Sequence, residues 1–148
     1  MSELKPFDDK LAALIASLSP ASRRKMAAEI AKQLRASQQQ RIKRQQAPNG
    51  TPYASRRQPV RGKKGRVKRA MFAKLRTNRY MKAKGSNDDA VVEFVGRVQR
   101  MARVHQEGLR DRPARYSREV RYEVRPLLGF SKPDLQMMEK IILLKIAL

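Results

Sequence analysis

The chain has 148 residues, no cysteine and a formal net charge of +22 at pH 7. That length predicts a single domain with one hydrophobic core, and the lack of cysteine excludes a disulfide framework and thiolate metal sites. No apolar run approaches the roughly 18 residues of a membrane span, and Met1 to Asp9 lacks the basic and apolar regions of a secretory signal. We therefore expect a soluble protein that is not exported by the general secretory route.

The positive charge is concentrated in one stretch. Between Arg23 and Lys84 lie 21 of the 35 Lys and Arg residues, against one carboxylate, Glu29. Because the remaining residues are close to neutral, the pattern indicates a compact body that carries a cationic segment. The partner of such a segment would be an anionic surface: nucleic acid, membrane headgroups or an acidic protein.

Two amphipathic helices are predicted at the amino end. The first begins near Phe7 and ends before Pro20, with apolar residues spaced by three and four. The second has Ser19 as its N-cap and Pro20 as its first residue, and it extends as far as Ile42. Because the link between them is short, we expect a helical hairpin over residues 1–45.

A long basic loop follows the hairpin. Proline and glycine residues recur from Ala47 onward, and no apolar period survives. Loops of this length usually serve a function or are disordered. We expect residues 46–68 to form an extended basic arm or loop, here called the basic arm, that contacts a partner. Its candidate contact residues are Arg56, Arg57, Arg61, Lys63, Lys64, Arg66, Lys68 and Arg69.

Residues 69–148 are predicted to form an α+β body. Tyr80–Lys84 and Ala90–Val95 are expected to be the two strands of a hairpin, because turn-forming residues separate them. A helix whose apolar face includes His105 should follow, with Gly108 as the residue just beyond its end.

The carboxy-terminal part is predicted to contain a strand and a strongly apolar helix. Val120–Val124 alternates apolar and charged residues, so one face of this strand should be buried. The last helix has Ser131 as its N-cap, and its second half is apolar nearly all round. It is either a central core helix or a helix at a subunit interface. The residues expected to build this core or interface are Leu135, Met138, Ile141 and Ile142.

Together these elements predict an α+β fold in a single domain of residues 1–148. Its parts are an N-terminal helical hairpin, the basic arm, a small antiparallel sheet with helices packed on it, and a C-terminal apolar helix.

Residues suited to catalysis are scarce. His105 is the only histidine, and the sequence lacks a glycine-rich phosphate loop, a paired-histidine motif and a nucleophile elbow. His105 is interpreted as a hydrogen-bonded structural histidine. Asp88, Asp89 and Glu93 could hold a divalent metal, although a solvated turn followed by a strand residue is the favoured interpretation. We expect no enzyme activity, no catalytic residue, no metal and no cofactor.

The charge of the basic arm leaves three interpretations open. The arm could neutralise the phosphates of nucleic acid without reading sequence. It could instead run across acidic subunits of an assembly, or remain a solvated loop without a dedicated partner. Aromatic residues are sparse in it, and it carries no recognised nucleic-acid-binding motif, so base stacking is only weakly indicated.

Several phrases of the sequence are characteristic of one family. They are Leu4–Ala12, Ala36–Arg41, Gln46–Tyr53, Met71–Arg76, Val104–Gly108 and Arg125–Phe130. Through them the chain resembles the tail completion proteins of contractile-tailed temperate bacteriophages, in the phage virion morphogenesis family, over its whole length. The more specific phrases contribute the family motif residues His105, Gln106, Gly108, Arg125, Pro126, Gly129 and Phe130. The last four are expected to fix the turn into the last helix, with Phe130 stapled against Leu135.

The resemblance implies a structural protein that caps the head-proximal end of the tail tube and sheath and allows joining to the head. It implies a ring, expected to be a hexamer, closed by one repeated contact. The implied partners are other copies of the chain, the tail tube and sheath proteins, and head-closure or connector proteins. Non-specific contact with DNA in the lumen is a lesser possibility, and no membrane is involved. The expected location is the head-proximal end of the tail in the virion, and the host cytoplasm during assembly.

An alternative interpretation is a small basic nucleic-acid-binding protein of the ribosomal or chromatin-associated type. The net charge favours it. The near-neutral carboxy-terminal half, with its predicted strands, does not.

Overall fold

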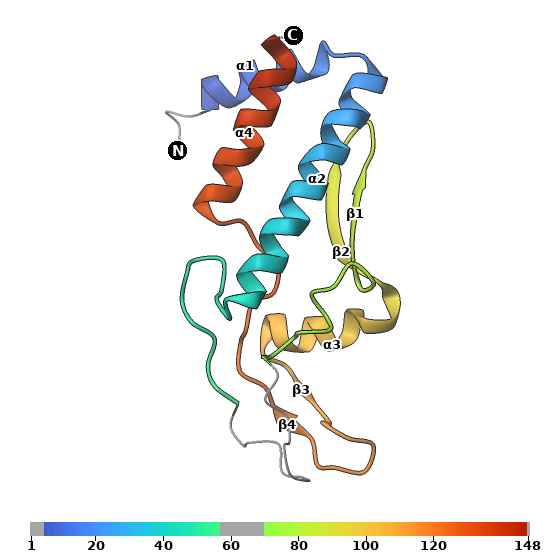
Figure 1. Ribbon diagram of the computed structural model, residues 1–148, viewed down its shortest axis with the longest axis vertical. Helices are drawn as coiled ribbons and strands as arrows, with labels where there is room; N and C mark the ends of the chain where they lie inside the picture. Colours follow the sequence, from blue (N-terminus) through green and yellow to red (C-terminus); the bar gives the residue numbers. More distant parts are fainter. Residues whose placement is uncertain (1–4, 57–69, 148) are drawn as a thin grey trace. The chain divides into compact units, whose positions relative to one another are not determined.

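Figure 1 shows the computed structural model, which describes residues 5–56 and 70–147. Helices and short two-stranded sheets alternate along these residues, which confirms the predicted α+β class. The elements are α1 (Lys5–Ala16), α2 (Pro20–Lys43), β1 (Met81–Gly85), β2 (Ala90–Phe94), α3 (Gly96–Glu107), β3 (Arg110–Asp111), β4 (Val120–Arg121) and α4 (Lys132–Ala147).

The described residues fall into two compact units. Unit 1 comprises residues 5–35, 83–92 and 132–147, and unit 2 comprises residues 36–56, 70–82 and 93–131. Each unit therefore draws on both the predicted hairpin and the predicted body. Among the described helices, none is long and apolar enough to cross a bilayer.

Apolar side chains of three helices form the core of unit 1. Met26 and Ile30 of α2 pack with Ile141 of α4, and partly buried residues of α1 and α4 surround them. The N-terminus of α2 begins as predicted, because the Ser19 Oγ accepts a hydrogen bond from the backbone N–H of Ser22 at 3.1 Å. Arg23 then donates from Nη1 to the carbonyl of Ala16 at 3.2 Å, which ties the end of α1 to α2.

The predicted first hairpin is confirmed, and its tip lies against α2 in unit 1. A tight turn joins the strands, with the backbone N–H of Ser86 bonded to the carbonyl of Asp89 at 2.8 Å. Gly85 makes the closest approach: a Cβ at this residue would lie 2.3 Å from the backbone nitrogen of Ala28. A glycine is therefore required here by space, since the opposing atoms are helix backbone.

Unit 2 is built around the end of α2 and around α3. The largest fully buried side chains of this unit include Ile42, Met81 and Leu127. As predicted, α3 ends at Gly108, which adopts a left-handed conformation with φ 67°. Directly after it, β3 pairs antiparallel with β4, so that Arg110 faces Arg121 and Asp111 faces Val120.

The prediction of a strand over Val120–Val124 with one buried face is wrong. Only Val120–Arg121 is a strand, and Val120 and Val124 are 37% and 59% exposed. The reason lies in the partner, because β3 offers only two residues for pairing. Beyond β4 the chain turns to the end of α3, where the N–H of Arg125 donates to the carbonyl of His105 at 2.8 Å.

Helix α4 is only partly covered within unit 1. Ile141 belongs to the core, and Met138 and Ile142 pack partly against it. Leu135, Leu143 and Leu144 are 52%, 45% and 57% exposed. Of the four residues predicted for the core or an interface, Ile141, Met138 and Ile142 thus contribute to the core of unit 1. Leu135 does not, and its interface role stays a prediction.

Candidate assembly interface

The chain between β4 and α4 is held in place by a side chain of α3. Residues 122–131 have no regular secondary structure, so their backbone groups need other partners. The Gln106 Oε1 accepts hydrogen bonds from the backbone N–H groups of Leu127 and Leu128, at 2.8 and 2.9 Å. Its Nε2 donates to the carbonyl of Leu128 at 2.8 Å. The side-chain amide of Gln106 therefore binds two backbone N–H groups and one backbone carbonyl of this segment.

Two buried polar residues of α2 hold the same segment within unit 2. The backbone N–H of Gly129 donates to the Oε1 of Gln38 at 3.1 Å, and the Arg41 guanidinium bonds to the same oxygen. Arg41 Nη2 also donates to the carbonyl of Gly129 at 3.2 Å. We call the side chains of Gln38, Arg41 and Gln106 the backbone latch, because together they bind residues 127–129 through main-chain groups.

Arg125 connects this segment to the start of the basic arm. Its side chain is buried and donates to the carbonyls of Ala54 and Ser55, at 2.8 Å from Nε and 3.0 Å from Nη2. The hydroxyl of Tyr53 donates to the carbonyl of Pro126 at 2.7 Å. The first residues of the predicted arm, up to Arg56, are thus anchored rather than extended from the body. Arg57, Arg61, Lys63, Lys64, Arg66, Lys68 and Arg69 lie outside the described residues.

Gln45 fixes both the entry to this loop and the point at which the chain returns. Its carbonyl accepts a hydrogen bond from the N–H of Tyr53 at 2.8 Å. Its side chain donates to the carbonyl of Met71 at 2.9 Å and accepts from the N–H of Met71 at 3.1 Å. Tyr53 and Met71 are therefore both held close to the end of α2.

Four rings form what we call the aromatic row: Tyr53, Phe72, His105 and Tyr122. Successive ring centroids are 5.7, 4.9 and 4.9 Å apart, and every pair meets edge to face. Phe72 adopts a φ of 66°, which is uncommon for a bulky residue and marks a backbone held by its surroundings. The row thereby links the basic arm, the segment after it, α3 and the chain after β4.

The pKa shifts in the aromatic row favour the neutral forms of His105 and Tyr53. Burial lowers the pKa of His105, and the charge of Arg125 lowers it further. Burial raises the pKa of Tyr53 to about 12, against an opposing effect of Arg41. Among the described residues, the buried Nδ1 of His105 has no hydrogen-bond partner. The predicted structural role of this histidine thus consists of ring packing, and the expected hydrogen bond is not found at this atom.

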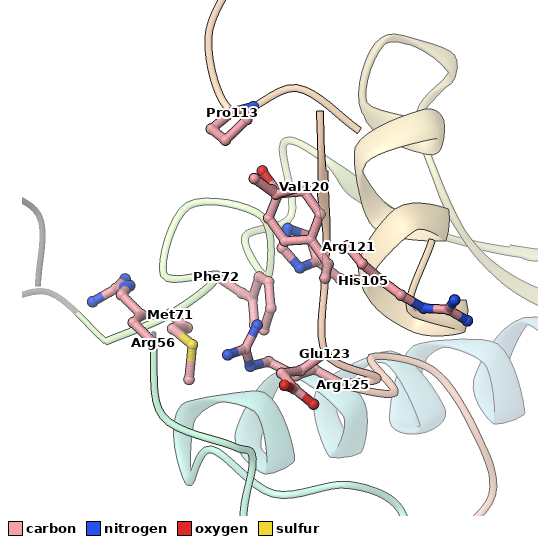
Figure 2. A pocket seen from close by; sticks show the side chains of 10 residues that line it. Arg56, Met71, Phe72, His105, Pro113, Val120, Arg121, Glu123 and Arg125 are labelled. Atoms are coloured by element: carbon pink, nitrogen blue, oxygen red, sulfur yellow. The ribbon is translucent and has the colours of Figure 1, made fainter. Parts of the chain in front are cut away.

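A pocket of about 600 Å³ opens beside the aromatic row within unit 2 (Figure 2). Apolar and aromatic side chains form much of its lining, and three arginines and one carboxylate supply its charges. The lining residues are Arg56, Met71, Phe72, His105, Pro113, Val120, Arg121, Tyr122, Glu123 and Arg125. A concave, largely apolar surface with a net positive charge suits an acidic partner segment that carries an apolar side chain.

Of the carboxylates considered for a metal, Asp88 and Asp89 lie in the turn between β1 and β2, and Glu93 belongs to β2. The hydroxyl of Ser86 donates to the Asp89 Oδ1 at 2.8 Å, and the N–H of Asp88 donates to the same hydroxyl at 3.2 Å. Over residues 5–56 and 70–147 there is no cluster of three or more acidic, histidine or cysteine side chains that could hold a metal ion.

The structure brings together most of the family motif residues. His105, Gln106, Gly108, Arg125, Pro126 and Gly129 all belong to unit 2, next to the latch or the aromatic row. Phe130 is 61% exposed, and the proposed staple against Leu135 remains a prediction. The members of the predicted core or interface set belong to unit 1.

Sequence reasoning missed the roles of Gln38, Arg41, Gln45, Tyr53 and Phe72. A signal for Gln38 was present, because Leu34, Gln38 and Ile42 are spaced by four on one helix face. A glutamine between two buried apolar residues at that spacing indicates a buried side chain in need of partners.

The chain is similar, over nearly its full length, to known proteins of one family. The phage virion morphogenesis family matches residues 2–147 of the chain. Tail completion protein S of Escherichia phage P2 is 51% identical over 145 residues, which cover 97% of this chain and 97% of that protein. No solved structure matches the chain.

Proposed function

Because the chain belongs to the phage virion morphogenesis family, we propose that it is a structural protein that completes the bacteriophage tail. The similarity to tail completion protein S extends over nearly the full length of both proteins, which supports the same role for this chain. In our proposal the protein acts without enzymatic activity, in the virion.

One observation carries the proposal beyond the family name. Four of the phrases that mark the family, Gln46–Tyr53, Met71–Arg76, Val104–Gly108 and Arg125–Phe130, meet in unit 2 around the latch and the pocket. Their side chains are used to hold backbone and to pack rings. Such residues maintain the shape of a surface, which is what a protein needs in order to fit other subunits.

In the finer form of the proposal, the protein caps the head-proximal end of the tail tube and sheath and allows the head to join. The pocket beside Arg56 and Arg121 is the docking point for an acidic segment of a tube, sheath or head-closure protein. Support comes from the lining, which combines apolar walls with an excess of arginine. The other predicted arm residues are proposed to add positive charge toward the same partner.

We further propose that copies of the chain associate into a ring, expected to be a hexamer, through the exposed side of α4. Leu135, Leu143 and Leu144 are large apolar residues left in contact with solvent by unit 1. Covering each would contribute on the order of 1 kcal/mol. A contact between this side and a different surface of the next copy would close a ring.

Genetic complementation tests the proposed role. A phage that lacks the gene should produce tails of abnormal length, or tails that do not join heads, and the wild-type gene should restore infectious particles. Val120→Glu, which puts a carboxylate at the rim of the pocket, should complement poorly although the purified variant folds. Val124→Glu is the matched control, since Val124 is exposed and outside the pocket lining. Normal, joined and infectious particles without the gene would overturn the proposal.

The ring is tested separately by light scattering or native mass spectrometry of the purified protein. Leu143→Asp/Leu144→Asp should shift the mass toward the monomer, because charges would replace the apolar contact. A control is Lys140→Asp/Glu139→Lys, which keeps the net charge at two exposed polar positions of the same helix. A mass that responds equally to both variants, or to neither, contradicts an interface at the exposed leucines.

A further inference from the structure

The hairpin formed by β3, β4 and their connection, Arg110–Arg121, carries a cationic cluster that the sequence pattern concealed. It contains five arginines and no lysine, against Asp111 and Glu119. All five arginines are exposed. Because this hairpin lies far along the chain from the basic arm, its charge was hidden within the near-neutral total of the carboxy-terminal half.

Arginine, and not lysine, supplies the positive charge in this part of the chain. All nine cationic side chains between Gly96 and Arg125 are arginines, whereas the basic stretch from Arg56 to Lys84 mixes seven arginines with six lysines. Arginine presents a planar set of donors that matches two phosphate oxygens at once, and it stacks on rings. Lysine offers only a compact point charge.

The turn at the tip of the hairpin is fixed by its own hydrogen bonds. The Ser117 Oγ accepts from the N–H of Ala114 at 3.0 Å and donates to the Ala114 carbonyl at 2.9 Å. Arg112 Nη1 donates to the carbonyl of Ser117 at 3.0 Å. A ligand that contacts this tip would therefore meet an ordered backbone, which lowers the entropy cost of binding.

An aromatic ring stands at that tip in solvent. Tyr116 is 89% exposed, so the fold gains almost nothing from it. The Arg115 guanidinium lies 5.4 Å from the centre of the Tyr116 ring. Where a ring and guanidinium groups share one exposed point, the ring can stack on an unpaired base while the guanidinium groups bind phosphates.

We propose that the hairpin Arg110–Arg121 is a nucleic-acid contact site, in which its arginines bind phosphates and Tyr116 stacks on an exposed base. The site reads no sequence, and it prefers single strands to duplex because a base within a duplex is already stacked. This inference does not rest on the proposed role in tail completion and can fail without affecting it.

Fluorescence anisotropy with the full chain tests the site. The probes are a labelled oligonucleotide of about 20 nucleotides and the same sequence as a duplex, titrated over a series of salt concentrations. Tyr116→Ala should weaken single-strand binding about tenfold and change duplex binding much less. Tyr116→Trp should retain the wild-type affinity, since it keeps a stacking ring.

Arginine variants test the phosphate contacts in the same assay. Arg115→Gln/Arg118→Gln should lower the slope of log affinity against log salt for the duplex by about 1 to 2, as expected for the loss of one or two phosphate contacts. Arg97→Gln/Arg103→Gln is the control, because it removes the same charge from exposed positions of α3. Its slope should stay closer to that of wild type.

Three results would contradict the proposed nucleic-acid contact site. Single-strand affinity unchanged in Tyr116→Ala, or equal losses in the hairpin and α3 variants, would show that binding arises elsewhere or from total charge. A poly-glutamate peptide that binds with the same dependence on Tyr116 would assign the tip to acidic protein. Each of these outcomes overturns the proposal.

Discussion

Both units bury apolar side chains, but they differ in the polar and aromatic contacts that accompany this burial. Unit 1 relies on apolar side chains such as Met26, Ile30 and Ile141, which occupy regularly spaced positions on helices. Unit 2 fixes an irregular segment through the backbone latch and packs four rings in a row. Apolar burial is non-directional, whereas hydrogen bonds impose distance and angle. The difference indicates that unit 2, in addition to its apolar core, holds a segment in a defined path.

The largest effect is expected from removing an apolar core side chain of unit 1. Ile141→Ala should lower the free energy of unfolding by about 3 kcal/mol, because it deletes a buried side chain and leaves a cavity. Chemical denaturation followed by circular dichroism measures the loss. Leu144→Ala on the exposed side of the same helix should cost less than about 1 kcal/mol in the monomer. Equal losses would show that the two sides of α4 are not distinct.

A second substitution tests close packing in unit 1. Gly85→Ala should destabilise by about 2 to 3 kcal/mol, since its Cβ would lie 2.3 and 2.6 Å from the backbone N and Cα of Ala28. Gly96→Ala is the control, because nothing lies within 4 Å of a Cβ there. Thermal unfolding of the two variants side by side measures the difference. A neutral Gly85→Ala would mean that the hairpin can move away from α2.

The third prediction concerns the backbone latch of unit 2. Gln106→Ala removes three hydrogen bonds and leaves the N–H groups of Leu127 and Leu128 without their acceptor. We expect a loss of about 2 kcal/mol. Hydrogen exchange should show faster exchange at these two amides, while the amides of unit 1 keep their protection. Gln136→Ala, at an exposed position of α4, is the control. Uniformly faster exchange throughout the chain would contradict a local latch.

The smallest effect is expected from the hydroxyl of Tyr53. Tyr53→Phe removes its bond to Pro126 and should cost about 1 kcal/mol near neutral pH. The folded-state pKa is raised to about 12 from 10.0, so the folded protein binds more protons between those values and loses stability as pH rises through them. The variant lacks this loss, so the stability gap between the two proteins should narrow above pH 10. A constant gap from pH 8 to 12 would show that Tyr53 is not buried as described.

The sequence allowed most of the regular elements to be predicted because their signals are local. Ser19 and Pro20 mark the start of α2, Gly108 marks the end of α3, and the turn from Ser86 to Asp89 separates two strands. The prediction of a strand over Val120–Val124 was wrong because alternating apolar and charged residues indicate a preference for strand structure but do not give the length of the partner strand.

The candidate site could be predicted only in part. The family phrases identified Gln106, Arg125 and Gly129, but not what each one contacts. Tyr53 bonds to a residue 73 positions away, and Gln106 bonds to residues 21 and 22 positions away. No periodicity over a few residues encodes such pairings, because they depend on the way distant segments pack. The exposure of Tyr116 likewise becomes visible only in three dimensions.

The latch has a consequence for how related viruses can diverge. Gln38 and Gln106 bind the main-chain amides of residues 127–129, which every amino acid except proline carries. Side chains of the captured stretch and its exposed neighbour Phe130 are therefore not what the latch recognises. Leu127 is fully buried, and a Cβ at Gly129 would lie 2.6 Å from the Cγ of Pro48, so neither position is open to change. The exposed side chain of Phe130 can vary among relatives, while residues 127–129 keep the same path.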